Sequence, residues 1–159
     1  MSLHSIKSHI YYQLIVYMLR EVIPIFLSTQ SKKQDIIAFL KELRELLEED
    51  DFNIDSDFTL IKKNKPDDEE HSTTYTLLDL DYDSRDIVDR LKELTVAEYS
   101  ETKIDKDDLN PPLLFVFGKD INRKLVYVKL KIKEKDNQKR RVLCVSFHYA
   151  RYKMNFPYA

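Results

Sequence analysis

The sequence predicts an α+β fold, with helices in the first two thirds of the chain and a meander of strands in the last third. In residues 34–49 and 85–94, apolar residues recur every three or four positions, which is the period of a helix. After residue 113, apolar and polar residues alternate instead, which is the period of a half-buried strand. Helices that precede a strand meander favour an α+β fold over a parallel, doubly wound sheet.

The N-terminal residues 1–33 are predicted to be an extension, helical or poorly ordered, of a single domain formed by residues 34–159. Residues 10–27 are partly apolar, but charged residues and Pro24 interrupt them. They fall short of the roughly 20 apolar residues that span a bilayer. They also lack the unbroken apolar stretch of a secretory signal. We therefore expect a cytoplasmic protein with no membrane partner.

The middle of the chain alternates between amphipathic helices and polar connections. An apolar stripe from Ile36 to Leu47 predicts a helix, and Asp83 and Ser84 form a typical helix start. The acidic run at 67–70 is expected to face water rather than hold a metal. The predicted elements are a helix at 34–49, a strand at 58–62, a loop at 64–71, a short helix at 75–80 and a helix at 85–94.

Three strands are predicted at residues 113–117, 125–133 and 141–148, joined by connections of hairpin length. In a strand, successive side chains point to opposite faces of the sheet. The face packed on the helices should carry Val126, Val128, Leu130, Ile132, Leu143, Val145 and Phe147. The opposite face should carry Tyr127, Lys129, Lys131, Lys133, Cys144, Ser146 and His148.

Charge is unevenly distributed along the sequence. Residues 111–159 contain 12 Lys or Arg against three Asp or Glu, whereas the first 110 residues contain 14 against 25. A strand face of cations, phenol and imidazole suits a polyanion, and RNA is the leading candidate.

Composition also argues against several kinds of site. The single Gly excludes the Gly-rich loops that bind nucleotide phosphates. The four His and the lone Cys144 show no metal-ligand spacing, and one Cys cannot form an internal disulfide. The sequence therefore predicts no cofactor and no metal, and Cys144 is expected to be a small packing residue.

The C-terminal third contains the motifs VYVK at 126–129, VSFH at 145–148 and FPY at 156–158. Together with the run at 115–132, they resemble the MqsR family of toxins from bacterial toxin–antitoxin pairs. Residues 83–99 are similar to that family's helix and the turn after it, so the resemblance covers roughly residues 72–158. It implies a RelE-like fold, with a small antiparallel sheet and helices on one face. It also implies a metal-independent endoribonuclease that cleaves mRNA, and an antitoxin, encoded next door, that silences it.

The resemblance also suggests site residues. The tyrosine of the family's strand motif corresponds to Tyr127, with Lys129 two positions further on, and a basic residue in the last strand corresponds to His148. A family lysine after the turn falls on Glu101 or nearby Lys103. A Trp-Gln-Asp segment of the family is replaced here, and we expect Lys119 to take over a phosphate-binding role.

Cleavage of RNA without a metal needs a base for the 2′-hydroxyl, a cation for the phosphorane and an acid for the leaving oxygen. His148 suits the base or the acid, because its ordinary pKa lies near 6.5. Tyr127 would position the phosphate or donate a proton, while Lys119 and Lys129 would hold its oxygens.

The sequence leaves several alternatives open. The alternative for His148 is a surface histidine at a strand end. Lys131, Lys133, Arg140 and Arg141 are expected either to bind RNA or to form a solvated face. Tyr149, Tyr152, Phe156 and Tyr158 would either stack on bases or pin the end of the chain to the sheet. The alternative to an endoribonuclease is a non-catalytic module that binds RNA or a protein.

Overall fold

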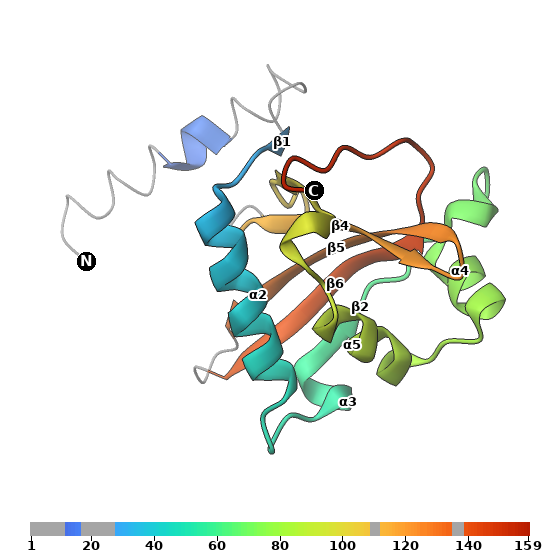
Figure 1. Cartoon of the computed structure of the whole chain (residues 1–159), viewed down its shortest axis with the longest axis horizontal. Helices are drawn as coiled ribbons and strands as arrows, with labels where there is room; N and C mark the ends of the chain where they lie inside the picture. Colours follow the sequence, from blue (N-terminus) through green and yellow to red (C-terminus); the bar gives the residue numbers. More distant parts are fainter. Residues whose placement is uncertain (1–11, 17–27, 109–111, 135–138) are drawn as a thin grey trace.

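A computed structural model describes residues 12–16, 28–108, 112–134 and 139–159. Within them, six strands form one sheet in the order β1-β3-β4-β5-β6-β2, and only the β2–β6 pair is parallel. The α+β prediction is confirmed (Figure 1). The strands are β1 (Ser28–Thr29), β2 (Phe58–Leu60), β3 (Tyr99–Lys103), β4 (Leu114–Ile121), β5 (Lys124–Glu134) and β6 (Arg140–Tyr149). The helices are α2 (Lys33–Leu47), α3 (Ile54–Asp57), α4 (Thr73–Leu80) and α5 (Ser84–Lys92), with 3₁₀ turns η2 (Glu69–His71) and η3 (Val96–Glu98).

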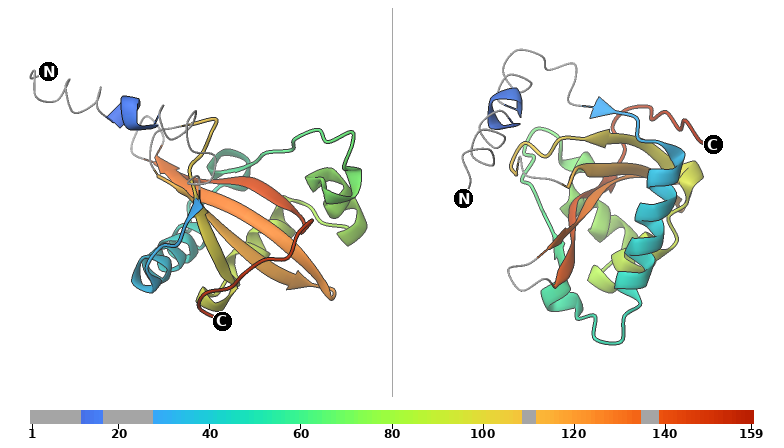
Figure 2. Two further views of the ribbon diagram at one scale, coloured as in Figure 1. Left: turned by 90° about the horizontal axis from the view of Figure 1, so that it is seen from above. Right: turned by 90° about the vertical axis from the view of Figure 1, so that its left-hand side faces the viewer.

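Helices α2 and α5 cover one face of the sheet and contact each other (Figure 2). Helix α2 buries the apolar stripe seen in the sequence, from Ile36 to Leu47. Helix α5 starts as predicted: the Asp83 carboxylate accepts hydrogen bonds from the backbone N–H groups of Arg85 (2.7 Å) and Asp86 (3.2 Å). The Asp86 side chain in turn accepts from the Asp83 N–H at 2.8 Å, which completes a capping box. None of the helices in the described ranges is long and apolar enough to cross a membrane.

A β-bulge in β6 corrects the predicted faces of that strand. Lys129 pairs with Ser146, but the next residue, Leu130, pairs with Cys144, so Val145 is an extra residue. An extra residue reverses the alternation on one side of the bulge. Cys144 is therefore buried in the core, and the predictions that Leu143 and Val145 face the core and that Cys144 faces away are wrong. Beyond the bulge, Phe147 joins the core as predicted.

Two strands were not predicted. Strand β3 lies between β1 and β4, and β1 pairs with it through Ser28 and Thr29. The sheet therefore includes residues that the sequence analysis assigned to the extension 1–33; apart from a helical turn at 12–16, most of that extension lies outside the described residues. Strand β4 also continues four residues past its predicted end and joins β5 through Asn122 and Arg123. Their φ angles of 51° and 67° are those of a tight hairpin turn.

The C-terminal tail, residues 150–159, crosses the face of the sheet opposite α5 (Figure 1). Its Phe156 ring lies directly over Gly118, the only glycine in the sequence. A Cβ atom added at Gly118 would lie 2.7 Å from Cζ of Phe156, closer than carbon atoms can approach. Tyr158 stacks on Tyr99 with ring centroids 5.8 Å apart and donates a hydrogen bond to the Ser31 carbonyl at 2.6 Å. The glycine is thus required by the close approach of the tail.

We expect Gly118→Ala to detach the tail while leaving the helix-covered core intact. The added methyl group must displace Phe156, and overpacking of this kind costs about 1–3 kcal/mol of unfolding free energy. Hydrogen exchange should rise in residues 152–158 and stay unchanged in β5. The matched double mutant Gly118→Ala/Phe156→Ala should be no less stable than Phe156→Ala alone, because the clashing ring is gone and the flexible Met154 side chain, whose sulfur lies 3.0 Å from the added Cβ, can move. Equal exchange in the tails of parent and Gly118→Ala would contradict this account.

Candidate functional site

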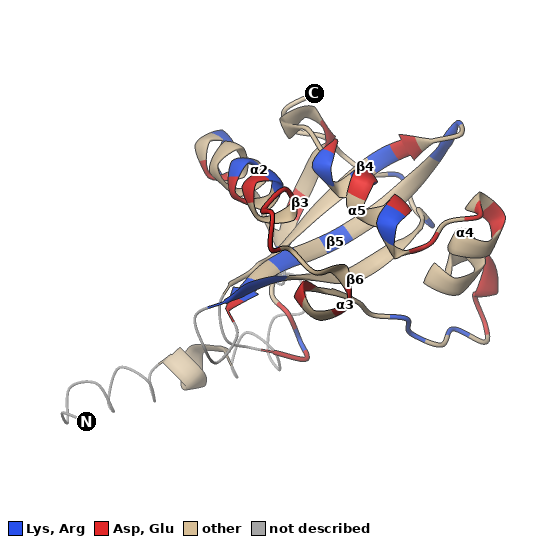
Figure 3. Cartoon of the chain, turned by 90° about the horizontal axis from the view of Figure 1, so that it is seen from below, with Lys and Arg blue, Asp and Glu red and all other residues tan. Residues whose placement is uncertain are grey.

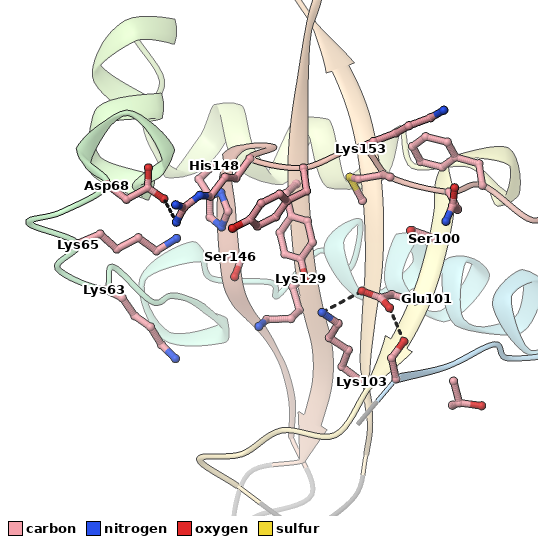
Figure 4. Close-up of a pocket in the computed structure, with 18 of the residues that line it drawn as sticks. Lys63, Lys65, Asp68, Ser100, Glu101, Lys103, Lys129, Ser146, His148 and Lys153 are labelled. Atoms are coloured by element: carbon pink, nitrogen blue, oxygen red, sulfur yellow. Dashed lines mark hydrogen bonds and ion pairs between the residues drawn. The ribbon is translucent and has the colours of Figure 1, made fainter. Parts of the chain in front are cut away.

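A groove of about 1290 Å³ lies on the open face of the sheet, the face that α2 and α5 leave uncovered (Figure 4). Strands β3, β5 and β6 form its floor, the loop after β2 forms one wall, and the C-terminal tail forms the other. Six Lys or Arg side chains line it against three Asp or Glu, so the groove favours an anion. These charged residues are Lys63, Lys65, Lys103, Lys129, Arg151, Lys153, Asp67, Asp68 and Glu101.

His148 and Tyr127 lie side by side on the floor. They are cross-strand partners in β6 and β5, and their rings stack with centroids 5.2 Å apart and planes 17° apart. Nδ1 of His148 lies 2.9 Å from the Tyr149 carbonyl oxygen. Because a carbonyl only accepts, Nδ1 must carry a hydrogen, and in the neutral ring Nε2 carries the lone pair. Nε2 makes no hydrogen bond with any described residue.

The surroundings favour a neutral His148 and a protonated Tyr127. Burial lowers the pKa of His148 below its ordinary 6.5, and the positive charges of Lys65 and Lys129 lower it further. Burial raises the pKa of Tyr127 above its ordinary 10.0, although Lys103 opposes this shift. At neutral pH the pair therefore consists of a proton acceptor and a proton donor.

Lysines from three parts of the sequence approach the floor of the groove: Lys63, Lys103 and Lys129 (Figure 4). Lys129 is half-buried opposite Ser146 and makes no ion pair within the described part of the chain. Burial lowers its pKa, as do the neighbouring charges of Lys103 and Lys63. Lys103 lies 6.0 Å from the centre of the Tyr127 ring and pairs with Glu101 at 2.9 Å. Burial alone would lower the pKa of Lys103, but Glu101 and Tyr127 raise it.

Lys119, which was predicted to belong to this site, lies outside the groove. Lys119 is the cross-strand partner of the core residue Val126, so it lies on the helix-covered face of the sheet. Its ammonium group lies 3.1 Å from Glu98 and 3.8 Å from Glu93. In β4, the residue on the open face beside Tyr127 is the preceding one, Gly118, which is the cross-strand partner of Tyr127.

The four residues predicted to bind RNA do not line the groove. Lys131 is fully buried and pairs with Asp105 at 2.9 Å and with Asp108 at 3.2 Å, which corrects its expected exposure. Lys133 also contacts Asp108, at 2.6 Å, and Arg140 pairs with Glu42 and Glu49 of the α2 region. Arg141 is half-buried. Acidic residues of the first 110 positions thus pair with basic residues of the strands, and Figure 3 shows acidic and basic segments close together in the fold.

Most of the cations in the groove were not predicted from the sequence. Lys63 and Lys65 follow β2, and Arg151 and Lys153 belong to the tail, so the fold alone brings them together. One pattern in the sequence could have indicated two of these cations: residues 62–65 contain three lysines and precede the acidic run at 67–70. Within the described ranges, no cluster of three His, Cys, Asp or Glu side chains could hold a metal ion.

The chain matches no family profile, no characterised protein sequence and no solved structure. The resemblance to the MqsR family therefore stays a prediction from the motifs of the C-terminal third.

Proposed function

We propose that this protein is an endoribonuclease that cleaves single-stranded mRNA without a metal ion, and that it is the toxin of a toxin–antitoxin pair. The proposal rests on the arrangement of three side chains on the floor of the groove. There the lone pair of His148 Nε2, the Tyr127 hydroxyl and Lys129, which has no ion-pair partner among the described residues, occupy neighbouring positions on β5 and β6.

The chemistry follows from these protonation states. Nε2 of His148 removes the proton from a ribose 2′-hydroxyl, and the 2′-oxygen attacks the adjacent phosphorus. The bond from phosphorus to the 5′-oxygen breaks, which gives a 2′,3′-cyclic phosphate on one product. The leaving 5′-oxygen takes a proton from Tyr127 or from one of the lysines. Lys129 and Lys103 offset the negative charge that builds on the phosphorane.

Purified protein is expected to cut single-stranded RNA in the presence of EDTA, because lysines supply the charge stabilisation in this reaction. The products should carry 2′,3′-cyclic phosphate and 5′-hydroxyl ends, which mass spectrometry identifies. A substrate with a 2′-deoxyribose at the cleaved position should resist cleavage, since it lacks the nucleophile. Activity that disappears with EDTA and returns with magnesium would overturn the mechanism.

The cleavage rate should be constant near neutral pH and fall in acid. A base must be neutral to act, and the pKa of His148 lies below 6.5, so the loss should begin only below that pH. The raised pKa of Tyr127 should keep its proton in place up to about its ordinary value of 10.0. The measurement is kcat/KM from pH 4.5 to 10. A rate that rises as the pH falls through 6 would show that His148 acts as the acid instead.

As a toxin, the protein would act in the cytoplasm on mRNA and be silenced by an antitoxin encoded next to it. Induction of the gene alone should arrest growth and leave cut transcripts, and co-expression of the neighbouring gene should relieve both effects. A module that only binds RNA or protein would leave transcripts intact.

A further inference from the structure

Four aromatic residues near the C-terminus differ in what they contact. Tyr149 is buried and donates a hydrogen bond from its hydroxyl to Asp79 at 2.6 Å. Phe156 covers Gly118, and Tyr158 stacks on Tyr99. Tyr152 is 73% exposed, although it lines the groove. Three of the four rings therefore hold the fold together, and Tyr152 remains available to a ligand.

The segment that carries Tyr152 is held at both ends. At its start, Arg151 pairs at 3.0 Å with Asp68, which belongs to the loop after β2 on the other side of the groove. Asp68 also contacts His71, three residues further along the chain, at 2.6 Å. At its end, Phe156 and Tyr158 fix the tail to β4 and β3. Tyr152 thus lies at the edge of the groove, on a segment that contacts the rest of the protein on both sides. Such bracing lowers the entropic cost of binding a ligand against the ring.

One cation lies against this ring, and two others line the same groove. The guanidinium carbon of Arg151 lies 5.3 Å from the centre of the Tyr152 ring, within the range of a cation–π contact. Lys153 follows it in the tail, and Lys65 lines the facing wall. An exposed aromatic ring beside a cationic groove is the combination that binds single-stranded nucleic acid, where bases stack on rings and cations hold phosphates.

We propose that Tyr152 is the stacking platform of a nucleobase subsite. It receives the base of a nucleotide next to the cleaved phosphate, while Lys65 and Lys153, which form no ion pair with a described residue, hold that nucleotide's phosphate. This inference rests on the proposed function, because it requires an RNA strand in the groove. The platform takes an unpaired base, since a base inside a duplex offers no face for stacking.

The test measures how tightly a short single-stranded RNA of mixed sequence, protected from cleavage by 2′-O-methyl groups, binds to the variants. Tyr152→Ala should bind it roughly 5- to 100-fold more weakly, the usual contribution of one base–aromatic stack. Tyr152→Phe should bind like the parent, because it keeps the ring. With cleavable RNA, Tyr152→Ala should raise KM more than it lowers kcat. Because the side chain is exposed, the melting temperature should not change.

Abasic substitution then locates the subsite. One base at a time is removed from the oligonucleotide, and each version is titrated against the parent and against Tyr152→Ala. At one position, removing the base should weaken binding to the parent but not weaken binding to Tyr152→Ala any further. Such non-additivity at a single position would establish the stack.

Two other results have distinct meanings. If Lys129→Ala weakens binding but Tyr152→Ala binds as tightly as the parent, the subsite is wrong, and the exposed ring serves another class of partner such as a protein. If the parent binds and cleaves no RNA at all, the proposed function itself fails, and the subsite fails with it.

Discussion

Replacing His148 with alanine should reduce the rate of RNA cleavage about 10²–10⁴-fold, the usual loss when a general base is removed. In the parent, the Nδ1 hydrogen bond to the Tyr149 carbonyl fixes the ring so that Nε2 is the basic nitrogen. Among the described residues no other imidazole lines the groove, so no second histidine is placed to replace it. His148→Gln should be equally inactive, since an amide cannot accept the proton. The measurement is single-turnover cleavage at pH 7.5.

Two comparisons make the result specific. Lys119→Met should cleave RNA near the parent's rate, because Lys119 lies on the other face of the sheet and pairs with Glu98 there. Urea denaturation should show that His148→Ala unfolds close to the parent, since the side chain lies on the open face and outside the hydrophobic core. Parent-like cleavage by His148→Ala would disprove the site. A much lower stability would instead identify His148 as a structural residue.

Periodicity predicted the elements whose faces differ sharply in polarity. Helix α2, helix α5 and strand β5 lie within a few residues of their predicted bounds, because each has one buried and one exposed face. Strands β1 and β3 were missed because they are short and polar, and because hydrogen bonds to neighbouring strands, rather than their own sequence, hold them in the sheet. The bulge at Val145 was missed for a related reason: one extra residue reverses a face without changing the composition of the strand.

The candidate site was only partly predictable. Tyr127, Lys129 and His148 lie on the open face as the alternation predicted, since that face is continuous from β5 to β6 beyond the bulge. Lys103, Lys65 and Arg151 come from three other segments, and no local pattern specifies that they meet. Net charge along the sequence was misleading, because acidic residues from the helices and loops pair with many of the basic residues on the strands. The groove has an excess of positive charge because three of its cations, Lys65, Lys129 and Lys153, form no ion pair with a described residue.

Lys131→Ala should lower the free energy of unfolding by about 3–5 kcal/mol, which is typical when one partner of a buried ion pair is removed. Lys131 is 0% exposed and Asp105 is 5% exposed, so the substitution leaves a buried carboxylate without its cation. It also removes the packing of the four-carbon side chain. The measurement is the urea midpoint and slope, and the slope should not change. RNA affinity should be close to that of the parent, contrary to what the charge pattern suggests, because Lys131 does not line the groove.

Lys133→Ala is the matched control, since Lys133 pairs with the same Asp108 but its side chain is 36% exposed. Its effect on stability should be clearly smaller, because water screens a partly exposed pair. The double mutant Lys131→Met/Asp105→Asn removes both charges of the buried pair, and it should recover most of the stability lost in Lys131→Met alone. If Lys131→Ala unfolds at the parent's urea concentration, water must reach Asp105 in the folded protein. If it keeps the parent's stability and loses RNA binding, Lys131 is part of the binding surface after all.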